Sequence, residues 1–240
     1  MNFSVRKYWA ALLPLLFGAI LATAAPAGRG AVLQYMNGTV SIQPHGTGSW
    51  VAAAVNDPLK NADNVWSDKA SRAELNAGTG VLQMNAETSL TLVNVAGPTI
   101  QLRLNQGTLY LHVRHLFDGE IYEVDSRDGA FTITKSGDYR FDVDPKADVT
   151  TITVWKGEGS VTSGERAAVR VKAHEQIRLA GVAAAYERHK APKPDGFDEW
   201  CRLRDQRLDS AYPRGYPYPY PYPYPPGVVI YGRPGPWYWR

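Results

Sequence analysis

The sequence predicts an all-β fold for its central part, a sandwich or roll built from many short strands. Apolar and polar residues alternate through residues 31–180 with the period of two that half-buried strands show. Turn-forming pairs such as Asn37-Gly38 and Gln106-Gly107 interrupt these alternations at short intervals. No stretch of this region carries a helical period long enough for alternating βαβ units. We expect Asn37-Gly38 to form a hairpin turn between two paired strands.

Three alternating segments show most clearly which side chains face the predicted core. They are residues 99–104, 108–113 and 138–143, and in each of them every second side chain is apolar and falls on one face. The inward-facing residues are Ile100, Leu102, Leu104, Leu109, Leu111, Val113, Tyr139, Phe141 and Val143. The charged residues expected to face water on the last segment are Asp138, Arg140 and Asp142.

Residues 1–25 have the three parts of a signal peptide. Arg6 and Lys7 precede an apolar run, and small residues suited to cleavage follow. We therefore expect an exported protein, in the periplasm, outside the cell or on the envelope. Without Arg6 and Lys7 the chain has 24 Lys and Arg against 23 Asp and Glu, and this near-neutral charge gives no case for binding nucleic acid. No later stretch is apolar over the roughly 20 residues that a transmembrane helix needs.

A short amphipathic helix is predicted after the β region. Residues 181–196 are small, charged and Pro-containing, which is typical of a linker. In residues 197–209 the large side chains fall on one helical face, and Asp198 and Glu199 occupy the first turn, where the helix dipole favours negative charge. The residues on this face are Phe197, Trp200, Cys201, Arg204 and Leu208, and Phe197 and Trp200 are predicted to dock on the β domain.

Residues 212–240 are rich in tyrosine, proline and tryptophan. The alternation of Tyr and Pro over residues 216–226 predicts a stiff polyproline II segment whose tyrosines point in three directions in turn. Three interpretations stay open: a spacer, an adhesive surface, or a strand that adds to the edge of a sheet. The candidate interaction residues are Tyr216, Tyr218, Tyr220, Tyr222, Tyr224, Trp237 and Trp239. Their partner would be an envelope protein, a glycan or a surface.

The histidines and the single cysteine form no recognisable catalytic or metal motif. His112 and His115 lie three residues apart on a predicted strand, so their imidazoles point to opposite faces and do not share an ion. Cys201 is predicted to pack as a small hydrophobe, with a disulfide dimer as the alternative. Because the sequence has neither a nucleophile motif nor a phosphate-binding glycine loop, we predict no enzyme activity and no cofactor.

The segment DVDPKAD contains the one candidate cation site of the sequence. Asp142 and Asp144 project to one side and Asp148 returns across the turn, which gives oxygen ligands of the kind that calcium accepts. Lys146 and Thr153 stand where a calcium-binding loop needs an oxygen ligand and a bidentate glutamate. We therefore interpret this segment as a solvated turn.

Four phrases of the sequence combine strand alternation with turn glycines: SDKASRAELNAG (67–78), LRLNQGTLYLHV (102–113), YEVDSRDGAFTITKSGDYRFDV (122–143) and TITVWKGEGSV (151–161). Together they resemble the FecR-type domain, an extracytoplasmic β domain first described in signalling proteins. FDEWCRLRD (197–205) is similar to the segment that follows this domain in secreted relatives with tails rich in Tyr, Trp and Pro. The resemblance implies an all-β fold and no catalytic motif.

The signalling members of this family have a cytoplasmic domain that handles a sigma factor, a membrane span and a receptor-contacting region. In this sequence seven residues precede the apolar run, so direct regulation of a sigma factor is not expected. The function we expect is that of an exported, non-enzymatic binding or scaffold protein of the bacterial cell envelope. The alternatives are an accessory to envelope signalling that works in trans with receptors or other FecR-type regulators, and a carbohydrate-active enzyme on a β scaffold.

Overall fold

The computed structural model describes residues 30–181 and 186–211. Within these ranges the chain forms a sheet of 15 strands and one helix, α1 (Gly196–Ala211), which confirms the predicted all-β class with a short helix near the C-terminus. Residues 1–25 and 212–240, the predicted signal peptide and interaction tail, lie outside the described residues. Within the described ranges, no helix combines the length and the hydropathy that a membrane crossing requires.

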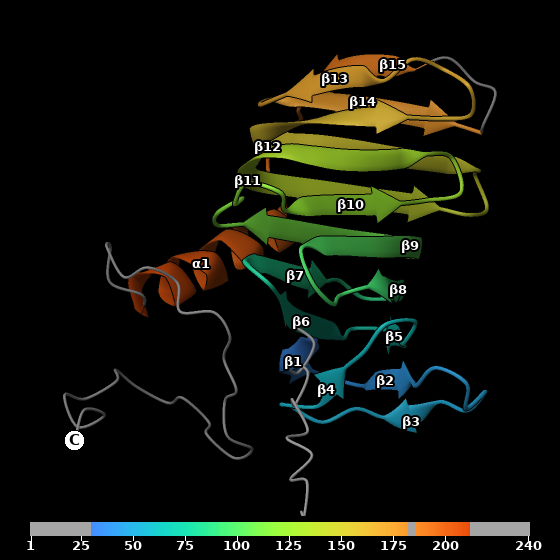
Figure 1. Ribbon diagram of the computed structural model, residues 1–240, viewed down its shortest axis with the longest axis vertical. Coiled ribbons are helices and arrows are strands. Elements are labelled where there is room, and N and C mark those ends of the chain that lie inside the picture. The colour runs from blue at the N-terminus through green and yellow to red at the C-terminus, as the bar shows by residue number, and fades with distance from the viewer. Residues whose placement is uncertain (1–29, 182–185, 212–240) are drawn as a thin grey trace, which may run out of the picture.

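The strands stack one above another and form two layers that face each other (Figure 1). One layer contains, in order, β15 (Glu187–Lys190), β14 (Glu175–Ala180), β12 (Val149–Thr162), β11 (Ala130–Asp144), β9 (Thr99–Val113), β7 (Gly80–Met84), β6 (Arg72–Ala77), β1 (Ala31–Asn37) and β4 (Pro58–Leu59). The other contains β13 (Val169–Lys172), β12, β11, β10 (Ile121–Asp125), β9, β8 (Thr88–Asn94), β5 (Asn64–Ser67), β2 (Val40–Gln43) and β3 (Val51–Ala52). All pairs are antiparallel except β9 with β10.

Three long strands, β9, β11 and β12, belong to both layers because each bends at a corner. The first half of β9 pairs with β8 and β10, and its second half pairs with β7 and β11. Gly107 stands at the corner of β9 with a φ of 89°, a conformation that glycine adopts without strain. A Cβ atom at this position would lie 2.6 Å from the Cα of Thr88, so the corner has no room for a side chain.

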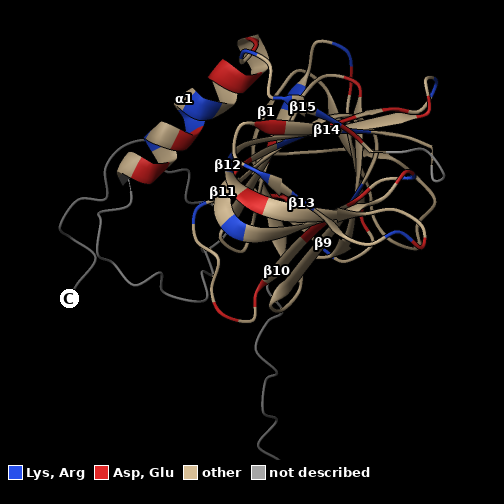
Figure 2. Cartoon of the chain, turned by 90° about the horizontal axis from the view of Figure 1, so that it is seen from above, with Lys and Arg blue, Asp and Glu red and all other residues tan. Residues whose placement is uncertain are grey.

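The hydrophobic core fills the space between the two layers, which enclose a common interior when viewed along the stack (Figure 2). All nine side chains predicted to face inward are at most 5% exposed, which confirms the predicted register of the three segments. Phe131 is completely buried in this core, and its ring contacts those of Tyr139 and Phe141 at centroid distances of 5.9 and 5.7 Å. The alternation of the sequence thus reports the inner faces of the layers correctly.

Two local predictions are wrong. Asn37-Gly38 does not close a hairpin, because β1 pairs with β4 and β6 whereas β2 pairs with β3 and β5. The turn instead carries the chain from one layer to the other, and Ser71 packs against Gly38 and accepts a hydrogen bond from the N–H of Thr39. The predicted linker, residues 181–196, contains strand β15, which extends the first layer beyond β14.

Helix α1 begins at a reciprocal cap. The carboxylate of Asp195 accepts hydrogen bonds from the N–H groups of Phe197 and Asp198, and the carboxylate of Asp198 accepts one from the N–H of Asp195. This arrangement satisfies donors that the first turn of a helix leaves unpaired. The cap explains why the helix begins at Gly196, one residue before the predicted start.

Candidate functional site

Helix α1 lies against the outer surface of one layer, outside the core (Figure 2). The strand register places Glu74 of β6, Gln83 of β7, Tyr110 of β9 and Arg140 of β11 side by side in one row across this surface. His112 and Asp138 are paired in the same way in a neighbouring row. We call these six residues the docking face.

The prediction that Asp138 and Arg140 face water is wrong. Asp138 is 5% exposed, and the side chain of Arg140 is 17% exposed, because α1 and the segment before it cover this surface. Glu74 and Gln83 are completely buried. The polar residues of this sheet face predict contact with water. In the structure the face is buried and carries charged side chains.

The first turns of α1 make the apolar part of the contact. Phe197 and Cys201 are buried against Tyr110, and Trp155 and Trp200 pack around them. The rings of Phe197 and Trp200 are stacked with a centroid distance of 5.8 Å. These contacts confirm the predicted docking of Phe197 and Trp200. Cys201 is a free thiol that is completely buried in this apolar contact, so it packs as the small hydrophobe that the sequence predicts, and its burial also raises its pKa.

An ion pair fixes the middle of α1 to the sheet. Arg204 Nε and Nη2 donate hydrogen bonds to Glu74 Oε2 and Oε1 at 2.6 and 3.0 Å, a two-point contact with a fully buried carboxylate. The guanidinium also lies over the ring of Tyr35, 3.8 Å from its centroid. Gln83 Nε2 donates to both Glu74 and Asp205, at 3.3 and 3.0 Å. Arg204, which the helical period places on the same face as Phe197 and Trp200, therefore contacts the sheet through charge and cation–π contact rather than through apolar area.

A second cation fixes the start of α1. Arg140 Nη1 donates to Asp195 at 2.6 Å and to Asp198 at 2.9 Å, and its Nε donates to Asp142 at 2.9 Å. Burial alone would raise the pKa of Asp195, but the hydrogen bond and the charge of Arg140, together with the N–H groups of Asp198 and Phe197, outweigh burial and lower that pKa to about 2. Beside this cluster a hollow of about 260 Å³ is lined by residues that include Trp155, Gln176 and Lys193.

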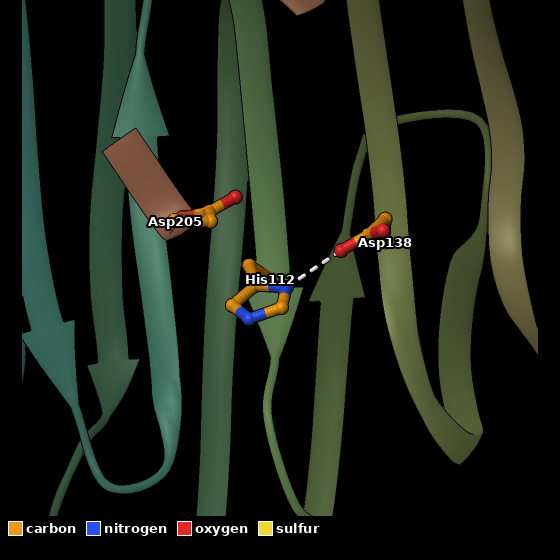
Figure 3. A group of neighbouring side chains, drawn as sticks. All are labelled: His112, Asp138 and Asp205. Atoms are coloured by element: carbon orange, nitrogen blue, oxygen red, sulfur yellow. Dashed lines mark hydrogen bonds and ion pairs between the residues drawn. The ribbon is translucent and has the colours of Figure 1, made fainter. Parts of the chain in front are cut away.

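The last turns of α1 cover a third group, in which a histidine lies among carboxylates (Figure 3). His112 Nδ1 is 2.5 Å from Asp138 Oδ1, and its Nε2 is 3.4 Å from Asp209 Oδ2. Asp138 Oδ2 pairs with Lys156 at 2.7 Å, and Asp209 pairs with Arg114 at 2.9 Å. Although burial opposes it, hydrogen bonding to Asp138 and Asp209 raises the pKa of His112 to about 9.

Asp205 completes this group from the helix side. It is 5% exposed, and burial, with negative neighbours adding to it, raises its pKa to about 7. Its Oδ1 accepts the hydrogen bond from Gln83, whereas its Oδ2 is buried without a hydrogen-bond partner. One donor atom from each of His112, Asp138 and Asp205 lies within 4.8 Å of the other two, so these three residues could hold a metal ion.

The sequence does not reveal this group, because its members come from β9, β11 and α1. The sequence places only His115 near His112, and these two histidines do not form a site together. The relevant neighbour is Asp138, which stands directly opposite His112 on the adjacent strand. The one available signal is the amphipathic pattern of the helix, which places Asp205 one turn after Cys201.

The predicted calcium candidate is not gathered into one site. Asp142 binds Arg140 and accepts a hydrogen bond from Thr108, Asp144 accepts the N–H groups of residues 146 and 147, and Asp148 pairs with Arg127. In the described part of the chain these three carboxylates do not form a metal-sized group. The candidate interaction residues between Tyr216 and Trp239 lie outside the described residues.

Comparisons with known proteins give a partial likeness of fold. No family model matches the chain, and no curated protein is similar to it. Two crystal structures of a "putative anti-sigma factor" from Parabacteroides distasonis, at 2.50 and 1.65 Å resolution, are similar in part, each with a TM-score of 0.47. Their sequence identities are 13% and 12%, over 53% of this chain and 59% of that protein, so the match spans less than two thirds of its length. A likeness of this size concerns the course of part of the backbone and says nothing of function.

Proposed function

We propose that this chain is an exported, non-enzymatic binding or scaffold protein of the bacterial cell envelope, with a FecR-like β domain. The observation that carries the proposal is the docking of α1 on a buried, charged face of the sheet. Three separate groups, around Arg140, Arg204 and His112, hold the helix at its start, middle and end. The β domain thereby fixes the position of Ala211, from which residues 212–240 continue.

The pairing of the polar side chains supports a scaffold rather than an enzyme. Glu74, Arg140 and His112 are bound to groups on or next to α1, and Asp138 is bound to His112 and Lys156. The helix covers these charged groups, whereas catalytic groups must reach a substrate. In the hollow beside Arg140, the guanidinium is already shared by three carboxylates of this chain. In this proposal the β domain is a rigid support, and residues 212–240 make the contact with an envelope protein, a glycan or a surface.

Fractionation of cells tests this proposal. The full chain and a variant ending at Ala211 are expressed with the native N-terminus, and both are followed through soluble and envelope fractions. We expect the full chain to be exported and envelope-associated, and the shortened chain to be exported, folded and soluble.

A matched control replaces the seven candidate Tyr and Trp residues by serine and keeps every proline, so that length and stiffness change little. This variant should behave as the shortened chain does if aromatic contact is what binds. Equal fractionation of all three proteins would contradict the proposal. Co-purification with a FecR-type regulator would favour the signalling accessory instead.

A further inference from the structure

We propose that His112, Asp138 and Asp205 form a binding site for one divalent transition-metal ion of the zinc type, closed when α1 docks on the sheet. The inference is independent of what residues 212–240 bind. Each ligand comes from a different element, β9, β11 and α1, and the three side chains are neighbours (Figure 3). The site therefore exists only in the docked state.

The distances fit a single ion after a small adjustment. Nitrogen and oxygen ligands lie about 2.0–2.2 Å from zinc, so two ligands of one ion are roughly 3.5 Å apart in tetrahedral geometry. The three donor atoms here lie within 4.8 Å of one another. A shift of about an ångström, within the reach of Asp and His rotamers, brings them to coordination distance.

The ion would take one oxygen of each carboxylate. Asp138 Oδ2 binds Lys156, and its Oδ1 shares a hydrogen bond with His112 Nδ1 at 2.5 Å, so an ion would take the place of the proton between these two atoms. Asp205 uses Oδ1 to accept from Gln83, and its Oδ2 is buried with no hydrogen-bond partner. A buried carboxylate oxygen without a partner is costly, and a cation would satisfy it. Lys156 and Gln83 would then be the outer partners that orient metal ligands.

The ligand set selects the class of ion. One imidazole nitrogen and two carboxylate oxygens suit zinc and its neighbours, whereas calcium needs six to eight oxygen ligands and magnesium a near-octahedral oxygen shell. The site is small, buried and contains nitrogen, so the alkaline-earth ions are disfavoured. Without an ion, a protonated His112 would be the cation between these carboxylates, and the test must separate these two states.

Titration of the full chain with Zn²⁺ gives that separation. After treatment with EDTA and dialysis, calorimetry should show one high-affinity Zn²⁺ per chain, and Co²⁺ should give the visible absorption bands of a low-coordinate site. Asp205→Asn and His112→Gln should each weaken Zn²⁺ binding by more than about 100-fold, because loss of a direct ligand exceeds the 10–100-fold effect of an outer partner. Glu199→Gln removes an exposed acid from the same helix and should bind Zn²⁺ as the wild type does.

Hydrogen exchange of residues 196–211 supplies a readout of the helix itself. With Zn²⁺ bound, the amides of α1 should exchange more slowly than in EDTA, and this difference should vanish in Asp205→Asn. Circular dichroism of each variant shows whether the β domain is intact. The proposal is wrong if the metal-stripped wild type takes up no stoichiometric Zn²⁺, or if Asp205→Asn and His112→Gln bind it as tightly as Glu199→Gln.

Discussion

The core between the two layers and the interface beneath α1 are both buried, yet opposite kinds of side chain fill them. The core consists of aliphatic and aromatic residues, whose contribution grows with the apolar area removed from water. The interface consists largely of charged and amide groups joined by directional contacts. A core side chain can be exchanged for one of similar volume, but a charged residue of the interface cannot lose its partner without leaving a buried charge.

The core should show the largest response to truncation. Phe141 is 1% exposed and packs edge-on against Phe131, so Phe141→Ala should lower the free energy of unfolding by about 3–5 kcal/mol. Urea denaturation followed by circular dichroism measures this loss. Leu111→Met, which nearly conserves volume in the same core, should cost less than about 1.5 kcal/mol. Equal losses of unfolding free energy in the two variants would contradict the claim that the core depends on the volume of its side chains.

The Arg204–Glu74 pair should show an intermediate response with a different signature. Arg204→Met leaves Glu74 charged and buried, which should cost about 3 kcal/mol of helix docking. Undocking of α1 gives Glu74 access to water, so we expect local opening of the helix before global unfolding. Adding Glu74→Gln to Arg204→Met should recover part of the loss, as a double-mutant cycle would measure. A double variant no more stable than Arg204→Met would show that the charge pair is not what holds the helix.

The contact of Arg140 with Asp195 should show the smallest response, because the side chain of Asp195 is 52% exposed and solvent screens the pair. Asp195→Asn keeps a good cap but removes the charge, and we expect a loss of about 0.5–1 kcal/mol at pH 5. The pKa of Asp195 is lowered to about 2 in the folded chain, so its contribution is present above pH 4 and fades as the pH falls toward 2. Stability curves of the two proteins should therefore converge in acid, with Asp142 and Asp198 facing the same guanidinium. A constant difference from pH 5 to 2 would exclude this assignment.

The core residues and the residues beneath α1 also differ in how well the sequence predicts them. Alternation in residues 138–143 predicts that Tyr139, Phe141 and Val143 face the core, because one face of a strand must be apolar to join it. It cannot tell whether the polar face meets water or another element. Asp138 therefore reads as exposed, although it is buried beneath α1.

The helix was predictable in itself but not in its partners. Its period places Phe197, Trp200 and Arg204 on one face, and these residues do contact the β domain. Arg204 pairs with a residue 130 positions earlier, and Asp205 with one 122 positions earlier. Such pairs depend on strand order and register, and the local periodicity of the sequence predicts neither. The same reason hides the group of His112, Asp138 and Asp205.

Buried charge pairs hold α1 on the sheet, and native-state hydrogen exchange measures this hold most directly. In the full-length wild type, the amides of residues 196–211 should be protected to a degree approaching that of β9, and Arg204→Met should abolish the protection of α1 while β9 keeps its own. Exchange of α1 in the wild type at the rate of an unfolded peptide would contradict the account, as would full protection of α1 in Arg204→Met.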